Sequence, residues 1–203
     1  MNPSSVQRSV ILTFDDGPEP VQDLQSIAET LYGQQISGCF FLLGQGVERH
    51  PDAARLLADH GHELANHGWD HAHMPTLTEP QMFDQLRRTQ DVIRQAAGLT
   101  PTRFRPPFGE GWFNEKCPEL IRSAQQLGLQ MIGWTLDTHD WKKPYGIRFD
   151  RVRERFDGFI ASGATRRIEL LMHITDGTAR DLPELIDYLR SLTFTFTTYD
   201  QQP

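Results

Sequence analysis

The sequence predicts an α/β protein in which a mainly parallel sheet curls into a barrel with helices outside. Short apolar runs alternate with longer amphipathic runs about seven times along the chain. This βα order predicts parallel strands, because each helix returns the chain to the start of the next strand. About seven such units in a chain of 203 residues favour a closed or nearly closed barrel over an open sheet.

Length and composition predict a single domain over residues 1–203. A chain with 38% hydrophobic residues can bury one ordinary core but is too short for two ordinary domains. The Pro- and Gly-rich stretch Pro101–Gly111 lies inside the alternating pattern. We therefore interpret it as an active-site loop and not as a domain boundary.

Seven segments have the composition of strands. Each is short, and most are rich in β-branched or aromatic residues. In chain order they are Ser9–Phe14, Ile36–Leu43, His62–Asn66, Thr102–Arg105, Leu129–Thr135, Ile168–His173 and Phe194–Thr198.

Six longer segments between the strands have the pattern of amphipathic helices. Their apolar residues recur at spacings of three and four, and glycine often follows the last of them as a stop. Thr78 is a candidate N-cap for the third helix. In chain order they are Val21–Tyr32, Val47–His60, Thr78–Ala97, Glu115–Leu127, Phe149–Ile160 and Leu182–Leu192.

Charge and hydropathy exclude some partners. The net charge of −7 argues against a protein that binds nucleic acid through its phosphates. No apolar run approaches the ~20 residues that a membrane span needs. The N-terminus has no apolar run typical of a signal peptide, which leaves the compartment open. Of the two cysteines, Cys39 lies in an apolar run and is expected to be buried.

Polar residues gather where the predicted strands end. Asp15 and Asp16 end the first strand, and His67 and His71 follow the third. Arg105 ends the fourth strand, Asp140 follows the fifth, and His173 ends the sixth. In a parallel barrel these ends lie on one side of the molecule, where chemistry occurs. The sequence therefore predicts one catalytic site built from distant segments.

The two histidines have the spacing of a ligand pair. Side chains four residues apart point the same way on a helix or tight turn. Two imidazoles and one carboxylate form a metal site that leaves positions open for water and substrate. Adjacent strand residues point to opposite sides, so Asp15 and Asp16 need separate roles, one on the metal and one towards the attacking water. Taken alone, the two aspartates are more simply explained as turn residues, and the two histidines as surface or core residues without a ligand.

Arg105 and Asp140 are candidate partners for the acid and the base. Arg105 leaves an apolar strand and can hold a carboxylate ionised and oriented, although a surface role is the simpler alternative. Asp140 can raise the pKa of His173, so that the imidazole can donate a proton.

At this point the residues resemble a known family. TFDDGP, NHGWDH, RPPFG, DTHDW and LMH occur in this order and are similar to the five motifs of the polysaccharide deacetylases of carbohydrate esterase family 4, the NodB-homology domain. The resemblance covers nearly the whole chain, from Leu12 to about Thr198. It implies a distorted (β/α)7-8 barrel.

The resemblance also implies roles for individual residues. The implied metal is a divalent ion, most often Zn²⁺ and sometimes Co²⁺ or Ni²⁺, and the implied substrate is an N-acetylated glycan. Carried over by position, Asp15 is the general base, Asp16, His67 and His71 are metal ligands, Arg105 orients Asp15, the backbone amide near Phe108 helps to hold the oxyanion, Asp140 tunes the general acid His173, and Trp141 and Leu171 wall the acetyl pocket.

The sequence departs from the family pattern in a few places. Phe108 stands where tyrosine is common, and Ile174 replaces a frequent aspartate. His62, His73 and His139 match no ligand position and are expected beside the site or at the surface. Trp112 and Phe113 are either a sugar platform or packed loop residues.

Three alternatives remain open from sequence. The first is an O-deacetylase of the same family that acts on acetylated xylan. The second is a non-haem iron oxygenase, whose site also has two histidines and a carboxylate. The third is a carbohydrate-binding protein without activity, which is disfavoured because every catalytic position is filled.

Overall fold

A computed structural model describes residues 8–113, 115–162 and 167–200. Its centre is one sheet of eight strands, in which every pairing is parallel. The strands follow the order β5-β4-β3-β2-β1-β7-β6, and β8 pairs with β1. The strands are β1 (Ser9–Gly17), β2 (Cys39–Leu42), β3 (Glu63–Asn66), β4 (Arg103–Phe104), β5 (Gln130–Met131), β6 (Leu136–Asp137), β7 (Arg167–His173) and β8 (Thr195–Phe196).

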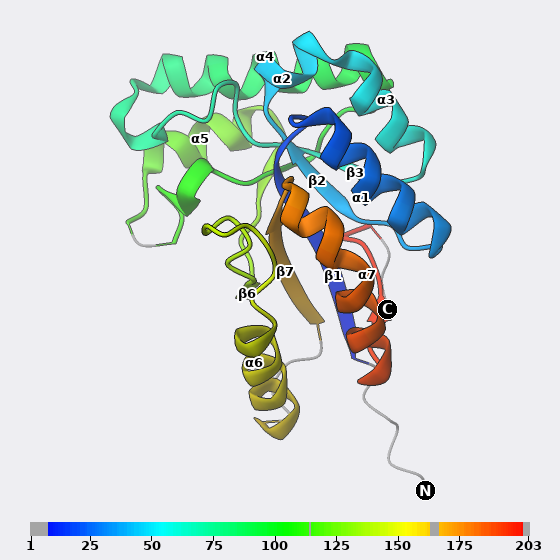
Figure 1. The fold of residues 1–203 in the computed structure, drawn as a ribbon. Helices are drawn as coiled ribbons and strands as arrows, with labels where there is room; N and C mark the ends of the chain where they lie inside the picture. Colours follow the sequence, from blue (N-terminus) through cyan, green and yellow to red (C-terminus); the bar gives the residue numbers. More distant parts are fainter. Residues whose placement is uncertain (1–7, 114, 163–166, 201–203) are drawn as a thin grey trace, which may run out of the picture.

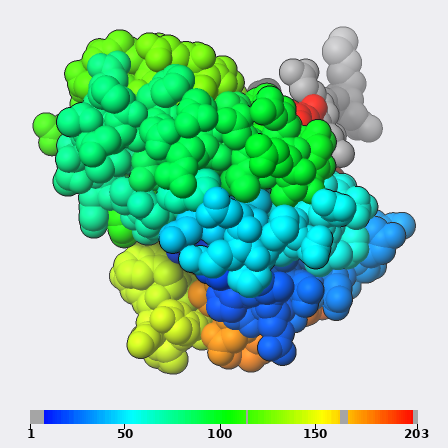
Figure 2. Space-filling view, turned by 90° about the horizontal axis from the view of Figure 1, so that it is seen from above, coloured from blue at the N-terminus to red at the C-terminus, as the bar shows by residue number. Residues whose placement is uncertain are grey.

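Helices surround this sheet (Figure 1). Successive contacts join α7, α1, α3, α4 and α5 into an outer row, and α2 packs on α4. Seen from above, α2, α3 and α4 form a continuous face in cyan and teal-green (Figure 2). The helices are α1 (Val21–Gly33), α2 (Gly44–Arg49), α3 (Pro51–Asp59), α4 (Glu79–Ala97), α5 (Pro118–Gln126), α6 (Phe149–Ser162) and α7 (Asp176–Ser191), with two 3-10 turns at Met74–Thr76 and Pro107–Gly109.

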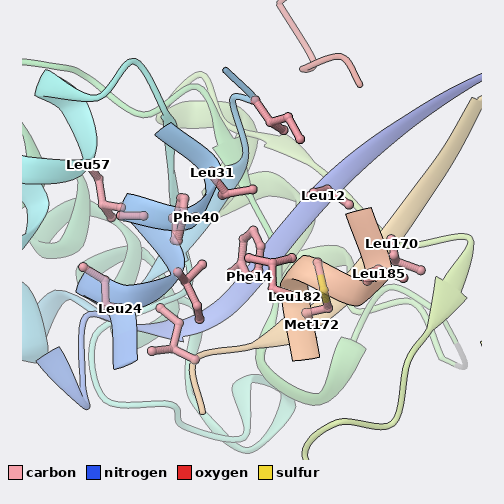
Figure 3. Packing of buried hydrophobic residues seen from close by; sticks show 14 of the residues in the cluster. Leu12, Phe14, Leu24, Leu31, Phe40, Leu57, Leu170, Met172, Leu182 and Leu185 are labelled. Carbon is pink, nitrogen blue, oxygen red and sulfur yellow. The ribbon is translucent and has the colours of Figure 1, made fainter. Parts of the chain in front are cut away.

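The main hydrophobic core lies between the sheet and the helices. Alternate strand residues such as Leu12, Phe14 and Phe40 are fully buried there against helix residues (Figure 3). The rings of Phe14 and Phe40 stack with centroids 4.8 Å apart. Because side chains alternate along a strand, the remaining strand residues point into the barrel.

The inner face of the sheet holds a smaller apolar cluster and the polar site above it. Cys39, Phe41 and Ala65 form the cluster together with Ile132. The same alternation places the side chain of Asp15, two residues beyond Thr13, on the inner face at the end of β1. The sheet therefore separates a structural core outside from a chemical centre inside.

The predicted curled parallel sheet with outer helices is confirmed, but its edges differ from the expectation. The single strand expected at Leu129–Thr135 is wrong, because the structure has β5 and β6 at opposite edges of the sheet. Between them, the Gly133 carbonyl accepts a hydrogen bond from Arg105 Nη2 at 2.8 Å instead of joining a ladder. Among the described residues no pairing joins β5 to β6, so the barrel is open on this side.

Three predicted helix boundaries are also wrong. The helix expected at Val47–His60 is two helices, because Pro51 has no N–H to continue the first and starts the second. Pro118 starts α5 three residues later than expected, for the same reason. Helix α7 starts at Asp176, six residues early, since Thr175 Oγ1 accepts the Thr178 N–H at 3.1 Å as an N-cap.

The prediction for α4 is confirmed at both ends. Thr78 and Gln81 form a capping box, and Gly98 ends the helix in the left-handed conformation with φ 72°. Of the helices that the structure describes, none is both long and apolar enough to cross a membrane.

Candidate active site

A pocket of about 370 Å³ opens at the carboxyl ends of the strands. All but two of the residues predicted for the site line it, and the other two, Arg105 and Asp140, lie fully buried behind it. Sequence reasoning missed Gly109, Trp134 and Asp137. Asp137 could have been predicted from the sequence, because it lies in the same DTHDW motif as Asp140. The lining residues are Asp15, Asp16, His67, His71, Phe108, Gly109, Trp134, Asp137, Trp141, Leu171 and His173.

Asp15 forms a buried ion pair with Arg105. Arg105 Nη1 donates to Asp15 Oδ1 at 2.7 Å and also contacts Thr13 Oγ1 at 2.9 Å. The guanidinium lies 4.0 Å from the centre of the Phe41 ring. The alternative of a surface role for Arg105 is wrong, because its side chain has no exposed area. Asp15 Oδ1 is thus occupied, which leaves Oδ2 facing His67 Nε2 at 3.8 Å.

Asp16 corrects the expectation that the two aspartates point to opposite sides. Both line the pocket, because Asp16 adopts a left-handed conformation with φ 71°. The pairing of β1 with β2 also shifts register between Phe14 and Gly17. This irregularity turns the Asp16 carboxylate back into the barrel, next to Asp15.

His67 and His71 converge on Asp16 from a loop. The residues directly after β3, from His67 to His73, are not helical, and Gly68 and His71 have φ angles of 80° and 61°. The Nε2 atoms of His67 and His71 lie 3.2 and 3.1 Å from Asp16 Oδ1. His67 Nδ1 donates to the Arg105 carbonyl at 2.7 Å, which leaves Nε2 for a ligand.

These three residues have the arrangement of a metal site. One ligand atom from each lies within 4.8 Å of the other two. Burial would raise the pKa of Asp16, but His67 and His71 outweigh it and hold that pKa well below its usual range. Burial would lower the pKa of His67, but the charges of Asp15 and Asp16 raise it. An ionised carboxylate beside two imidazole nitrogens is a donor set of the kind that holds divalent ions.

His173 is held by Asp140 on the β7 side of the pocket, next to Asp15. Asp140 Oδ1 accepts the Nδ1–H of His173 at 2.9 Å, and Oδ2 accepts its backbone N–H at 2.7 Å. Thr178 Oγ1 also donates to Asp140, at 2.6 Å. Burial would lower the pKa of His173, but Asp140, followed by Asp15 and Asp16, raises it to about 9. Nδ1 is thus occupied, and Nε2 remains without a hydrogen bond to Asp140 in a residue that lines the pocket.

Aromatic side chains form the walls. Phe108 is 52% exposed and Trp141 is 46% exposed, and both line the pocket. Trp141 Nε1 donates to Asp137 Oδ2 at 3.3 Å, which orients the indole. Leu171 adds a buried apolar surface to the lining.

The remaining sequence expectations have mixed outcomes. His62 lies at the opposite end of β3, where Nδ1 accepts the Gly38 N–H at 3.2 Å, so it is not beside the site. His73 and His139 do lie near it, because His73 stacks on Phe108 and His139 lies beside Trp141, and both of these partners line the pocket. Phe113 packs against Trp134 with centroids 4.5 Å apart, as a packed loop residue would. Cys39 is buried as expected.

Comparisons with known proteins agree with this geometry. The sequence profile of the polysaccharide deacetylase family matches residues 3–132. A peptidoglycan-N-acetylglucosamine deacetylase from Listeria monocytogenes is 30% identical over 200 residues, 98% of this chain and 39% of that protein. The chain thus spans less than half the length of this relative.

Two solved structures share the fold. A family 4 carbohydrate esterase from Streptomyces lividans in complex with acetate has a TM-score of 0.79 at 29% identity, covering 94% of this chain and 92% of that one. A pseudoenzyme of carbohydrate esterase family 4 from Bacillus anthracis has a TM-score of 0.79 at 27% identity, covering 94% and 63%. Fold alone therefore does not decide activity. Since the profile match extends over more than half of the sequence, the chain belongs to the polysaccharide deacetylase family.

Proposed function

We propose that residues 1–203 form a single catalytic domain that hydrolyses N-acetyl groups from glycans containing N-acetylglucosamine. The proposed cofactor is a divalent metal ion, and zinc is the ion we favour. The observation that carries the proposal is that three groups of side chains meet at one pocket. These are the Asp16, His67 and His71 cluster, the Asp15–Arg105 pair and the His173–Asp140 pair.

The residues present fit a divalent metal ion. Asp16 Oδ1 is buried and accepts no well-aligned hydrogen bond from the described residues, although two imidazole nitrogens lie within 3.2 Å. Asp16, His67 and His71 would hold the ion and leave positions open. Bound there, the ion would supply a Lewis acid for the substrate carbonyl.

Asp15 is the proposed general base. Its Oδ1 is occupied by Arg105, so Oδ2 is the oxygen that takes the proton from the attacking water. Arg105 keeps the carboxylate charged and fixes its direction. Arg105 also bonds to Thr13 on β1 and to the carbonyl of Gly133 between β5 and β6. The guanidinium that orients the base is therefore fixed from two parts of the sheet.

His173 is the proposed general acid. With Nδ1 bonded to Asp140, the proton on Nε2 is available to the leaving amine. An amine leaves poorly without this proton. The backbone N–H of Phe108 is the proposed donor to the oxygen that gains charge, and such donors contribute about 3–4 kcal/mol in acyl-transfer sites. Trp141 and Leu171 enclose the acetyl methyl group.

The substrate class follows from the relatives together with the site. The Listeria relative is named for N-acetylglucosamine in peptidoglycan. The carbohydrate esterase from Streptomyces keeps an O-acetyl substrate open as the alternative. The protonated His173 favours the amide, because an alcohol leaves more easily than an amine and needs an acid less.

Acetate release from a panel of glycans tests the proposal. The panel contains acetylated chitooligosaccharides, peptidoglycan fragments and acetylated xylan, each with chelator and with added zinc. We expect zinc-dependent release from the N-acetylated glycans, and Asp15→Asn is the matched control that keeps the metal site. Faster release from xylan would favour the esterase. Binding without release from any glycan would show a protein without this activity.

A further inference from the structure

The two histidines of the proposed metal site are held in different ways. His67 Nδ1 donates to the Arg105 carbonyl at 2.7 Å, and a hydrogen bond at this second ring nitrogen is the usual way to fix a ligand histidine. In the part of the chain that the structure describes, the ring of His71 has one polar contact, between Nε2 and Asp16. Its side chain is also 29% exposed. The direction of His71 therefore depends on the path of its backbone.

One peptide group in the loop before His71 is bonded at both ends. The carbonyl of Gly68 accepts the N–H of Gly44, at the start of α2, at 3.0 Å. The N–H of Trp69 donates to Oε1 of Gln85, in the middle of α4, at 2.6 Å. Because a peptide group is planar, these two bonds fix its orientation and the dihedral angles on either side of it. The loop needs such support, since Gly68 and His71 both have positive φ.

Gln85 also binds the residue directly before His71. Its Nε2 donates to Asp70 Oδ1 at 2.9 Å. One side-chain amide thus uses its acceptor and its donor on two consecutive loop residues, Trp69 and Asp70. We propose that Gln85, which lies outside all five sequence motifs, is a positioning residue that directs His71 towards the metal ion. This proposal rests on the metal-dependent function proposed above.

Loss of the Gln85 amide should loosen the loop without removing a ligand. Trp69 is 8% exposed, so its N–H would lose an acceptor at a place that water reaches poorly. A shift of the loop that satisfies this N–H would also move His71. We expect a loss of zinc affinity of about tenfold, at the lower end of the range for residues that support a ligand, because His67 and Asp16 keep their own contacts.

Competition with a chelating dye measures zinc affinity in wild type, Gln85→Ala and Gln90→Ala. Gln90 is the matched control, because it is another half-buried glutamine of α4 and its Nε2 donates to the carbonyls of Pro101 and Leu127. We expect zinc to bind about tenfold more weakly to Gln85→Ala and equally well to Gln90→Ala. The absorption spectrum of bound Co²⁺ depends on ligand geometry, so it should change in Gln85→Ala and not in the control. Equal losses in both variants, or none in Gln85→Ala, would overturn the proposal.

An exchange of hydrogen-bonding groups tests the same contacts without leaving a gap. In Gln85→Glu/Asp70→Asn, the carboxylate at position 85 can accept both the Trp69 N–H and the amide at position 70. The net charge is that of wild type, so the attraction for a cation is retained. We expect this double variant to bind zinc as wild type does. A loss of about tenfold here would contradict the role given to the Gln85 hydrogen bonds.

Zinc affinity and acetate release together separate this proposal from the deacetylase function. If wild type binds zinc but releases no acetate, and Gln85→Ala binds zinc more weakly, the deacetylase function is refuted and the role of Gln85 is supported. If wild type releases acetate and Gln85→Ala keeps full zinc affinity, the function stands and the role of Gln85 is wrong. If wild type binds no zinc, both are refuted.

Discussion

The buried pair of Asp15 and Arg105 gives the sharpest test of how the site is held together. We consider Asp15→Asn, Arg105→Met and the double variant, with methionine chosen to keep an apolar stem over Phe41. The pair is almost completely buried, and its atoms lie 2.7 Å apart. At an effective dielectric of ~20, two charges at that distance attract by about 6 kcal/mol, before the cost of removing them from water.

Each single variant leaves one charge buried without its partner. Breaking a buried pair in this way costs about 3–5 kcal/mol of unfolding free energy. For a chain of this size that lowers Tm by about 10 °C. The double variant leaves neither charge, so we expect it to lose less than the sum of the single variants, by more than about 2 kcal/mol.

Urea unfolding of all four proteins, in the presence of a chelator, measures this coupling. The chelator matters, because a metal ion beside Asp15 would partly replace the lost arginine. Thr13→Val is a useful control, since it removes a neutral partner of Arg105 and leaves both charges in place. Additive losses, with a coupling below about 0.5 kcal/mol, would refute the claim that Arg105 is held mainly by Asp15.

Three further predictions concern the chemistry. In Asp15→Asn the zinc content should stay near that of wild type while turnover falls by about 100-fold or more, as measured by acetate release and metal analysis; retained turnover would contradict the assignment of the base. In His67→Ala zinc and activity should be lost together, with a loss of affinity beyond the ~10–100-fold typical of residues that only support a ligand; stoichiometric zinc in this variant would refute the ligand set. The pKa of His173 is raised to about 9, so the protonated acid is present below that value and activity should fall as pH rises through it, at a lower pH once a cation is bound nearby. Asp140→Asn should move this alkaline limb to lower pH, and an unchanged limb would exclude His173 as the acid.

The sequence was sufficient for most of the order of elements and for most of the residues that line the pocket, but not for β5 and β6 or for Gly109, Trp134 and Asp137. Long segments with a clear period, such as α4, could be predicted to within one residue because propensity, capping and burial agree there. The motif residues could be identified because acids and imidazoles fall at the same end of several predicted strands, and their roles followed from the resemblance to the deacetylase family. Strands of two residues, such as β4 and β6, are too short to show an alternation of apolar and polar residues. Their limits depend on pairing with adjacent strands, which the sequence alone does not identify.

Local backbone conformation was the main feature that sequence reasoning could not supply. An aspartate or a histidine with positive φ has no distinctive signature in one sequence, unlike a glycine. Asp16 and His71 both adopt that conformation, and both owe their direction to it. The expectation from ideal strand geometry was therefore wrong for Asp16, and of the two alternatives for His67 and His71, a helix or a tight turn, the helix does not hold.

The relation between Asp15 and His173 shows why the site needs the whole barrel. Asp15 and His173 are register partners in the parallel pair β1 and β7. Neighbouring strands lie about 4.8 Å apart, so the proposed base and acid stand side by side although most of the chain lies between them. The proposed metal-ligand histidines approach from the other side, after β3, with β2 in between. The proposed ligands come from β1 and from the loop after β3, whereas His173 comes from β7 and is bonded to Asp140. A cation held by Asp16 would lower the pKa of His173, and the Asp140 carboxylate would oppose that effect by stabilising the protonated imidazole.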